Sequence, residues 1–434
     1  MNREGLRDRL GIIGLLLLYK IVIELSYYFS TSPLYARNGL IWNPDLGKYV
    51  YSILLFFILV LTLPENIRQV SSLFCLMFDM ISVLPLISFY WMSSADNVAV
   101  TISVIMVCII HCVCRIDTKH YIEFSIRDVE FYISVLFALY ILITIFLIIK
   151  RGGIDTRVLS FMSNKDIYKV RSENNITGIL GYFSNWSTRV FFPFFFCYYI
   201  YFKKNLKAFF CVCLQLCMFL SFGNKSMLFS IGLVSMVLVA GLFGKSFRKI
   251  IIVEFLLINV PVVFATLSNF LYKICFIFCS LVSMRMLFIP AMIKFEYFDF
   301  FSQRNYLFFS EGVLGRIFEI EYPYKQTIGK ILDILYHGAE GNSNTGVIAD
   351  AYANAGIVGM IGIALIIAFL LKLVDIVTNN FSSGIAFAVL SSTCVTFNDN
   401  GLLINLLTGG MLFLIVLLAL FNSAVKQSKN SIEI

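Results

Sequence analysis

Long apolar segments separated by short polar connections run through most of the chain. Most of them are close to the roughly 20 residues that an α-helix needs to cross the hydrocarbon core of a bilayer. They predict about twelve membrane-spanning helices, near residues 11–29, 48–63, 72–90, 97–114, 130–149, 179–202, 208–222, 226–243, 250–267, 355–374, 384–398 and 402–422. The pattern therefore indicates an all-α, polytopic integral membrane protein with a single transmembrane domain.

Two polar segments, residues 150–178 and 268–350, are much longer than the other connections. The second contains a further apolar run, at 273–292, which is interrupted by charged residues and by Pro290. We expect this run to lie on the membrane surface or to re-enter the membrane, and not to span it. In a membrane protein, long loops with ionisable side chains are a preferred place for a functional site.

The composition excludes a soluble protein of this size. Hydrophobic residues make up 59% of the chain, charged residues only 14%, and the mean hydropathy is +0.86. So few charges cannot cover the surface of a soluble domain. The first apolar run follows Arg9, and no small-residue cleavage site comes after it. We therefore expect this run to be kept as a membrane helix and not removed as a signal peptide.

The distribution of lysine and arginine predicts the orientation. The N-terminal segment carries three arginines, and the short connections on the same predicted side carry most of the other loop cations. The short connections on the opposite side carry only Arg37, Lys48 and Lys225. Because positively charged short loops remain in the cytoplasm, both termini are predicted to be cytoplasmic. The two long loops, 150–178 and 268–350, then face outward.

These two outer loops carry more cations than the charge rule predicts. Long loops partly escape the rule, so the charges could simply be solvated. Alternatively, they could hold an anion beside the membrane, where a low dielectric strengthens the attraction. A cationic rim at one depth would suit a phosphate whose lipid tail stays in the bilayer, and its members would be Arg171, Arg189, Lys225 and Arg285.

Several kinds of site are not supported by the sequence. The chain contains no P-loop, HExxH zinc motif, GxSxG elbow or Rossmann glycine pattern. Its cysteines lie in apolar runs, where a thiol is an ordinary small hydrophobic group. Cys108, His111, Cys112 and Cys114 lie close in sequence, but no second cluster completes a four-ligand site. We expect no metal, no cofactor and no nucleic-acid partner.

Ionisable residues also lie within the apolar runs. Lys20 and Glu24 are four residues apart on one helix face and can neutralise each other. Asp79 and Glu254 have no such neighbour in the sequence. A charge at the bilayer centre costs about 2.5 to 3.5 kcal/mol, so each should face protein or water. Either could be a proton relay, which keeps a transporter open as an alternative.

Three stretches resemble the Wzy-type polymerases that assemble bacterial O-antigen and capsule repeat units. The first is Ile167-Tyr-Lys-Val-Arg171 with Gly178-Ile-Leu-Gly-Tyr182. The second is Arg285-Met-Leu-Phe-Ile-Pro290 with Tyr297-Phe-Asp-Phe-Phe301. The third is Gly341-Asn-Ser-Asn-Thr-Gly346 with Asp350-Ala-Tyr-Ala-Asn-Ala-Gly356 and Gly359. The order of these stretches, two outer loops and about a dozen spans extend the resemblance over most of the chain.

The resemblance implies a GT-C-like fold in the bacterial inner membrane and a glycosyl transfer at its periplasmic face. The donor would be a growing glycan on undecaprenyl pyrophosphate, and the acceptor a hydroxyl of another lipid-linked repeat unit. Membrane lipids and a chain-length regulator protein are further expected partners.

The residues suggest how such a reaction would run. Fixed positive charge would stabilise the leaving pyrophosphate, and arginine suits this role because it stays protonated and binds bidentately. Arg285 and Arg171 are the first candidates, followed by Arg304, Arg189 and Lys225. Asp350 is the candidate proton acceptor, although an acidic residue at a helix N-terminus is also stabilising by itself. Asn342 and Asn344 would line the site. Tyr297, with Tyr322 and Tyr324, could stack on sugars or belong to an aromatic belt.

Two related activities remain open. O-antigen ligases usually carry a His-Asn pair before a comparable helix, whereas this chain has Asn344-Thr-Gly346 without histidine. A flippase for lipid-linked oligosaccharides would need charges along a central path, and here they gather at one face. A purely structural membrane protein would not need so many arginines at one depth.

Overall fold

The computed structural model describes residues 3–66, 68–117, 126–159, 178–243, 259–260, 262–263, 279–338, 341–344 and 346–430. Throughout these residues the regular structure is helical. Eight helices of this described part are long and apolar enough to cross a membrane, and Leu46–Thr62 and Ser383–Phe397 are shorter apolar helices. The protein is therefore a multi-pass α-helical membrane protein.

The helical elements follow one another with short connections. In the first half they are α1 (Arg3–Ser26), η1 (Tyr27–Thr31), α2 (Ser32–Tyr35), η2 (Ala36–Asn38), α3 (Leu46–Thr62), α4 (Val70–Phe78), η3 (Asp79–Val83), α5 (Leu84–Trp91), α6 (Asn97–Cys114), α7 (Val129–Lys150) and η4 (Thr156–Leu159). In the second half they are α9 (Ile179–Trp186), η5 (Ser187–Phe191), α10 (Phe192–Tyr201), α11 (Asn205–Phe222), α12 (Lys225–Phe243), η7 (Cys279–Phe288), α15 (Ile289–Ser302), α16 (Val313–Ile317), α17 (Ile328–Leu332), η8 (Asp333–His337), α18 (Val347–Val377), α19 (Ser383–Phe397), α20 (Leu402–Leu406) and α21 (Met411–Asn430).

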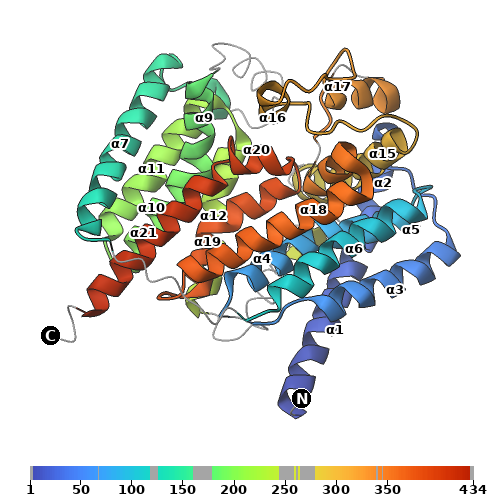
Figure 1. Cartoon of the computed structure of the whole chain (residues 1–434), viewed down its shortest axis with the longest axis horizontal. Coiled ribbons are helices and arrows are strands. Elements are labelled where there is room, and N and C mark those ends of the chain that lie inside the picture. The colour runs from blue at the N-terminus through green and yellow to red at the C-terminus, as the bar shows by residue number, and fades with distance from the viewer. Residues whose placement is uncertain are drawn as a thin grey trace.

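Both ends of the described chain lie on the same side of the helix bundle. In Figure 1 the start of α1 and the end of α21 point downward, whereas α16, α17 and the short helix α20 lie at the opposite side. The chain therefore enters and leaves the described bundle at the same side. We call the side of α20 the upper side and the side of the chain ends the lower side.

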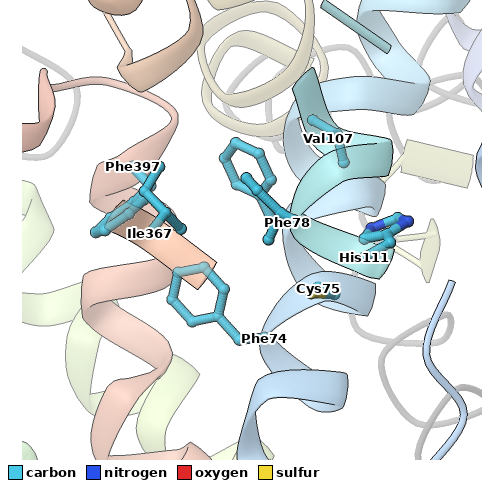
Figure 2. A pocket seen from close by; sticks show the side chains of 8 residues that line it. Phe74, Cys75, Phe78, Val107, His111, Ile367 and Phe397 are labelled. Carbon is cyan, nitrogen blue, oxygen red and sulfur yellow. The ribbon is translucent and has the colours of Figure 1, made fainter. Parts of the chain in front are cut away.

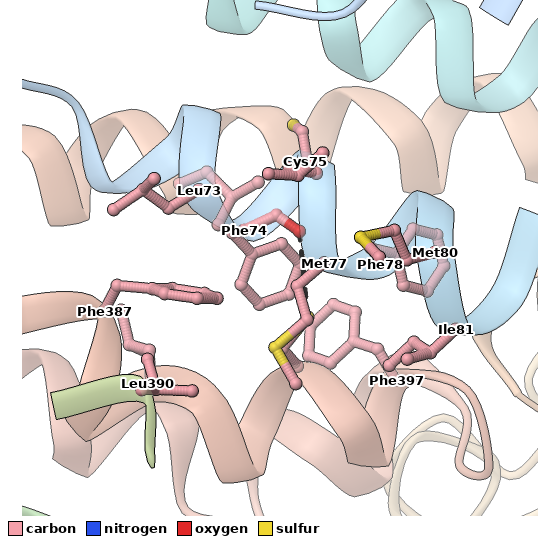
Figure 3. Packing of buried hydrophobic residues seen from close by; sticks show 14 of the residues in the cluster. Leu73, Phe74, Cys75, Met77, Phe78, Met80, Ile81, Phe387, Leu390 and Phe397 are labelled. Carbon is pink, nitrogen blue, oxygen red and sulfur yellow. Dashed lines mark hydrogen bonds between the residues drawn. The ribbon is translucent and has the colours of Figure 1, made fainter. Parts of the chain in front are cut away.

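The helix α4 lies at the centre of the bundle. All of its residues are buried, and it packs against α6, α18 and α19. Figure 3 shows Phe74 and Met77 of α4 between the helix and Phe387, Leu390 and Phe397 of α19, while Cys75 points the other way. A small cavity with room for about one water molecule lies between α4, α6, α18 and α19 (Figure 2). A helix that is apolar all round is expected in this central position.

Four prolines within apolar runs shape their helices in the same way. Pro33, Pro85, Pro193 and Pro290 each lie at the second residue of an α-helix, directly after a π-helical segment. Proline has no N–H to donate, and its ring clashes with the carbonyl four residues earlier. The helical turn before each proline is therefore wider than an α turn, and here it is a π-helical turn. Three of these π segments carry an ionisable residue, namely Asp79, Arg189 and Arg285.

The predicted spans agree with the helices in most places and differ in two, and one further region is not tested. The predicted span 250–267 and the start of the 273–292 run lie largely outside the described residues. The predicted span 402–422 is divided into α20 and α21, since residues 407–410 interrupt the helix. The helix predicted at 355–374 begins earlier, at Val347, and has non-helical backbone at Ala355 and Gly356.

Candidate functional site

An ordered polar turn connects α19 to α20 at the upper side of the bundle. Asn398, Asp399, Asn400 and Gly401 form this turn, which we call the Asn398 turn. The buried Asn405 stabilises it from within, because its Nδ2 donates to the carbonyl oxygens of Asn400 (2.9 Å) and Gly401 (3.1 Å). Such buried amide bonds give the turn a single conformation.

Lys294 of α15 binds directly to this turn. Its side chain is 1% exposed, and its Nζ donates to Asn398 Oδ1 (2.8 Å) and to the Pro290 carbonyl (3.3 Å). Asn398 Nδ2 in turn donates to the carbonyl of Met286 (3.0 Å). One asparagine thus connects η7, α15 and the turn after α19, and it places an ammonium group at the turn.

A second cation and a carboxylate complete this cluster. The half-buried side chains of Arg189, from η5, and Asp399 are electrostatic neighbours, and Lys294 also acts on Asp399. Within the described part of the chain, neither cation is close enough to a carboxylate to form an ion pair. The cluster therefore combines two basic side chains with one carboxylate on which both act electrostatically, without an ion pair at contact distance among the described residues.

Burial shifts the pKa values of two members. It raises the pKa of Asp399 from 3.8 to about 6, and the nearby Lys294 and Arg189 oppose this shift. It lowers the pKa of Lys294 from 10.5 to about 7, and Asp399 opposes that shift. Both changes have the same cause, since removal from water disfavours the charged form of each group. Both groups can therefore change protonation state near neutral pH, as an acid–base site requires.

Asp350 lies beside the turn and is held by hydrogen bonds. Its Oδ2 accepts from the backbone N–H of Leu402 (3.2 Å), and its Oδ1 accepts from Asn354 Nδ2 (3.1 Å). Gly401 permits this approach, because a methyl group at that position would overlap the carboxylate. Asp350 thus stabilises the start of α20 from a different helix, much as an N-terminal cap does.

The break in α18 provides attachment points for the outer loop. The carbonyls of Ala353 and Asn354 accept from the N–H groups of Leu307 and Phe308 (both 2.9 Å). Asn354 Oδ1 also accepts from the N–H of Phe309 (2.8 Å). An unbroken α-helix would use these carbonyls for its own bonds. The break thus fastens the loop to α18, one turn after Asp350.

The glycine of the Asn344-Thr-Gly346 stretch also packs against the turn. Gly346 has a φ of 44°, and a methyl group there would overlap the carbonyl of Asn398. Its Cα region also lies beside the Lys294 side chain. Glycine is therefore required by close backbone contact as well as by conformation.

The structure brings together only some of the residues predicted from sequence. Asp350 and Arg189 lie in or beside the cluster, whereas Arg171 lies outside the described residues. Arg285 is exposed and directly precedes Met286, whose carbonyl binds Asn398. Its backbone is therefore close to the turn, and its side chain acts on Tyr35.

Other predicted residues have different surroundings. The guanidinium of Arg304 lies 4.2 Å from the ring centroid of Phe300, and Lys225 is the first residue of α12. Asn342 and Asn344 are exposed. Tyr297 is only 2% exposed and packs in a hydrophobic cluster with Phe301. Its ring is therefore part of a core and offers no open face to a sugar.

Sequence reasoning did not identify Lys294, Asn398 or Asp399 as site residues. In the sequence, Lys294 is one of several charges in the second outer loop, just after the apolar run at 273–292. The run Asn398-Asp-Asn-Gly401 lies at a short connection between two predicted spans. Four consecutive polar or turn-forming residues between apolar helices were the available signal, because such a turn at a membrane surface can carry function.

The side chains at the cysteine-rich end of α6 have separate surroundings in the structure. Among the described residues no group of three or more His, Cys, Asp or Glu side chains could hold a metal ion. Cys112 is exposed and Cys114 is buried. His111 lies next to Asp79 of η3 instead.

Searches of protein-family models, of curated proteins and of solved structures give no match to this chain. The function must therefore be argued from the site itself.

Proposed function

We propose that the protein polymerises lipid-pyrophosphate-linked oligosaccharide repeat units at the outer face of a bacterial inner membrane. The observation that carries the proposal is the cluster of Arg189, Lys294 and Asp399, in which two basic side chains act electrostatically on one carboxylate and, among the described residues, neither forms an ion pair with it. Buried cations without a contacting carboxylate are costly, and an anionic ligand would compensate them. The upper side of the bundle would face the periplasm, with both termini in the cytoplasm.

The two cations suit the leaving group of this reaction. As the bond between the anomeric carbon and the phosphate oxygen breaks, its electron pair remains on the pyrophosphate. Arg189 and Lys294 would stabilise that charge, and the low dielectric at the site would strengthen their effect. A full set of about twelve spans and a GT-C-like arrangement belong to the same proposal.

Asp399 is the better candidate for the proton acceptor. The acceptor hydroxyl would transfer its proton to the carboxylate while its oxygen forms the new bond to the anomeric carbon. A raised pKa of about 6 suits a base that works near neutral pH. Asp350 instead uses both carboxylate oxygens as hydrogen-bond acceptors within the protein. We therefore assign Asp350 to positioning the start of α20 and the adjacent turn.

The decisive test uses purified protein in liposomes with lipid-linked repeat units. Arg189→Ala and Lys294→Met should each reduce polymer formation about a hundredfold or more, as expected when a transition-state charge partner is removed. Arg189→Lys should recover only part of the activity, since lysine keeps the charge and loses the planar fork.

The matched control is Lys204→Ala. Lys204 is an exposed cation between α10 and α11, and it lies 3.9 Å from Glu130. Its loss should leave the product ladder unchanged. Normal ladders from both Arg189→Ala and Lys294→Met, at normal protein levels, would refute the proposed site.

A transporter for lipid-linked oligosaccharides is the second candidate. One observation favours it, namely a carboxylate and a histidine that face each other inside the bundle, Asp79 and His111. Intramembrane ionisable groups commonly mark proton pathways in transporters. In a transport assay, protein-dependent translocation of the intact lipid-linked unit without polymer formation would favour this candidate.

A further inference from the structure

Two titratable side chains lie against each other in the interior of the helix bundle. Asp79 is the first residue of η3, and His111 lies near the end of α6. The side chain of His111 is 0% exposed and that of Asp79 is 1% exposed, and His111 Nε2 lies 3.4 Å from Asp79 Oδ1. Both elements belong to segments long and apolar enough to span the membrane. Neither residue belongs to the cluster at the Asn398 turn.

The Asp79 carboxylate has unusually few partners for a buried acid. Among the described residues, neither of its oxygens has a hydrogen-bond donor, and His111 Nε2 has no well-aligned acceptor. Asp375 of α18 provides a contrast. Its oxygens accept from the backbone N–H (2.9 Å) and the hydroxyl (2.6 Å) of Ser71, and Lys372 lies 3.4 Å away. Such bonds favour the ionised form of a buried acid and oppose the effect of burial, and Asp79 lacks them among the described residues.

The π segment explains why Asp79 points into this interior. Pro85 follows η3 closely, and the wider turn before it shifts the helix register between Phe78 and Leu84. A local departure from α-helical geometry at an ionisable residue is a common feature of functional sites. Among the described residues, the titratable side chains around the pair include Cys75 from α4, Cys108 and Cys114 from α6, and Asp375 from α18, which is paired with Lys372.

The pair has a polar connection toward the lower side of the bundle. His111 Nδ1 lies 3.1 Å from the hydroxyl of Thr62, the last residue of α3, and Thr62 is partly exposed. The start of α1 is close to Thr62, since Arg9 donates to the neighbouring carbonyl of Leu61 (2.7 Å). A proton could therefore reach the imidazole from the side of the chain ends.

On the other side of the Asp79–His111 pair, the described residues around the cavity are mainly apolar and do not continue the polar connection. The small cavity beside His111 is lined mainly by aromatic and aliphatic groups (Figure 2). Ile367 and Phe397 lie at its far end, opposite His111. Phe397 directly precedes Asn398. The pair is thus open through one hydroxyl on the lower side and closed by apolar side chains toward the upper side.

We propose that Asp79 and His111 form an intramembrane binding site for one proton, filled through Thr62 from the lower side. In the empty site the carboxylate is ionised and neutral His111 carries its proton on Nε2. A proton arrives at Nδ1, the Nε2–H bond breaks, and that proton binds to Asp79. The filled site holds a neutral carboxylic acid beside a neutral imidazole, so one unit of negative charge disappears from the apolar interior.

The experiment is infrared difference spectroscopy of the reconstituted full-length protein between about pH 5 and about pH 9. Wild-type protein should show the C=O stretch of a protonated carboxylic acid at the acid end, with more than half of its amplitude lost at the alkaline end. Asp79→Asn should remove one pH-dependent component of this band, while the component from Asp399, whose pKa is about 6, should remain. The matched control Asp375→Asn should retain the component that Asp79→Asn removes, because Asp375 is a separate buried acid that binds Ser71 and Lys372.

Histidine resonances provide a second measurement that does not depend on the carboxyl variant. The chain has three histidines, so His120→Gln with His337→Gln leaves His111 alone. In ¹⁵N-labelled protein, its protonated nitrogen should change from Nε2 to Nδ1 as the band appears. Thr62→Val should slow proton uptake after a pH jump about tenfold or more, with the endpoint unchanged, because it removes the hydroxyl that connects to solvent.

Two results would overturn the inference. A band that is constant over the whole pH range would mean a permanently protonated acid with a structural role. The absence of any band that Asp79→Asn removes, together with an imidazolium signal at every pH, would mean a fixed ion pair. Neither result concerns glycan transfer, so this inference and the proposed function can fail separately.

Discussion

Replacing Asp399 by asparagine should give a protein that is more stable at neutral pH and inactive. Burial raises the pKa of Asp399 from 3.8 to about 6. The folded state therefore binds more protons than the unfolded state between these values, and stability falls as the pH rises through this window. At 1.36 kcal/mol per pKa unit, the ionised carboxylate costs up to about 3 kcal/mol above pH 6, and less to the extent that solvent screens this half-buried group.

Asparagine keeps the shape of the side chain and does not ionise. The variant should thus lose this cost, and its apparent unfolding temperature in detergent should exceed that of wild type at pH 7.5. At pH 4.5, where the carboxyl is largely protonated, the two proteins should unfold at similar temperatures. Turnover at pH 7.5 should fall about a hundredfold or more, because asparagine cannot accept a proton.

The two measurements test different parts of the argument. Near-normal turnover would show that Asp399 is not the base, whatever the stability. A variant that is less stable than wild type at pH 7.5 would show that the carboxylate is held by favourable contacts and not disfavoured by burial. Inactivity with a large loss of stability would therefore not support the assignment.

The remaining predictions concern the same cluster. The kcat/KM of wild type should depend on pH as a bell, with an acid limb near the Asp399 pKa of about 6 and an alkaline limb near the Lys294 pKa of about 7. A bound anionic substrate should raise the pKa of Lys294, so the alkaline limb of the kcat profile should lie at a higher pH than that of kcat/KM. An alkaline limb at the same pH in both profiles would contradict the role of Lys294 as an anion partner. Gly401→Ala should displace the carboxylate of Asp350 and cost about 1 to 3 kcal/mol in stability, measured by thermal unfolding beside the neutral control Gly362→Ala, whose surroundings are open. Asp350→Asn should lower turnover but keep the acid limb of the pH profile, and loss of that limb would return the role of base to Asp350.

Local sequence patterns predicted the helices because span length and apolar composition are local properties. The apolar runs between residues 97 and 114 and between 130 and 149 correspond closely to α6 and α7. The division between α20 and α21 was missed because residues 407–410 are mostly apolar or glycine, and hydropathy alone does not show a break in the backbone there.

The site was only partly predictable because its contacts join distant parts of the chain. Lys294 and Asn398 are 104 residues apart, and Asp350 binds the backbone of Leu402, 52 residues later. No periodicity encodes such pairs. The sequence indicates a role for Arg189, because it is a charge in a predicted span near the outer face. It gives no such indication for Asp399, which interacts with Arg189 in space but lies in a short polar turn of the sequence. Arg171 lies outside the described residues, so its role stays a prediction from the sequence.

The π segments before the four prolines have a consequence for how this protein tolerates change in length. A π turn contains one more residue than the α turn that it replaces. Deleting a single residue from η5 would let this turn close as a regular α turn, so the flanking helices would keep their phase, whereas Arg189 within the turn would move around the helix axis by up to about 100°, since 3.6 residues complete a turn. Arg189 could then be kept in the sequence and still lose its direction toward Asp399. For helices of this kind, the spacing between the charged residue and the following proline constrains the fold as strictly as the identity of the charge.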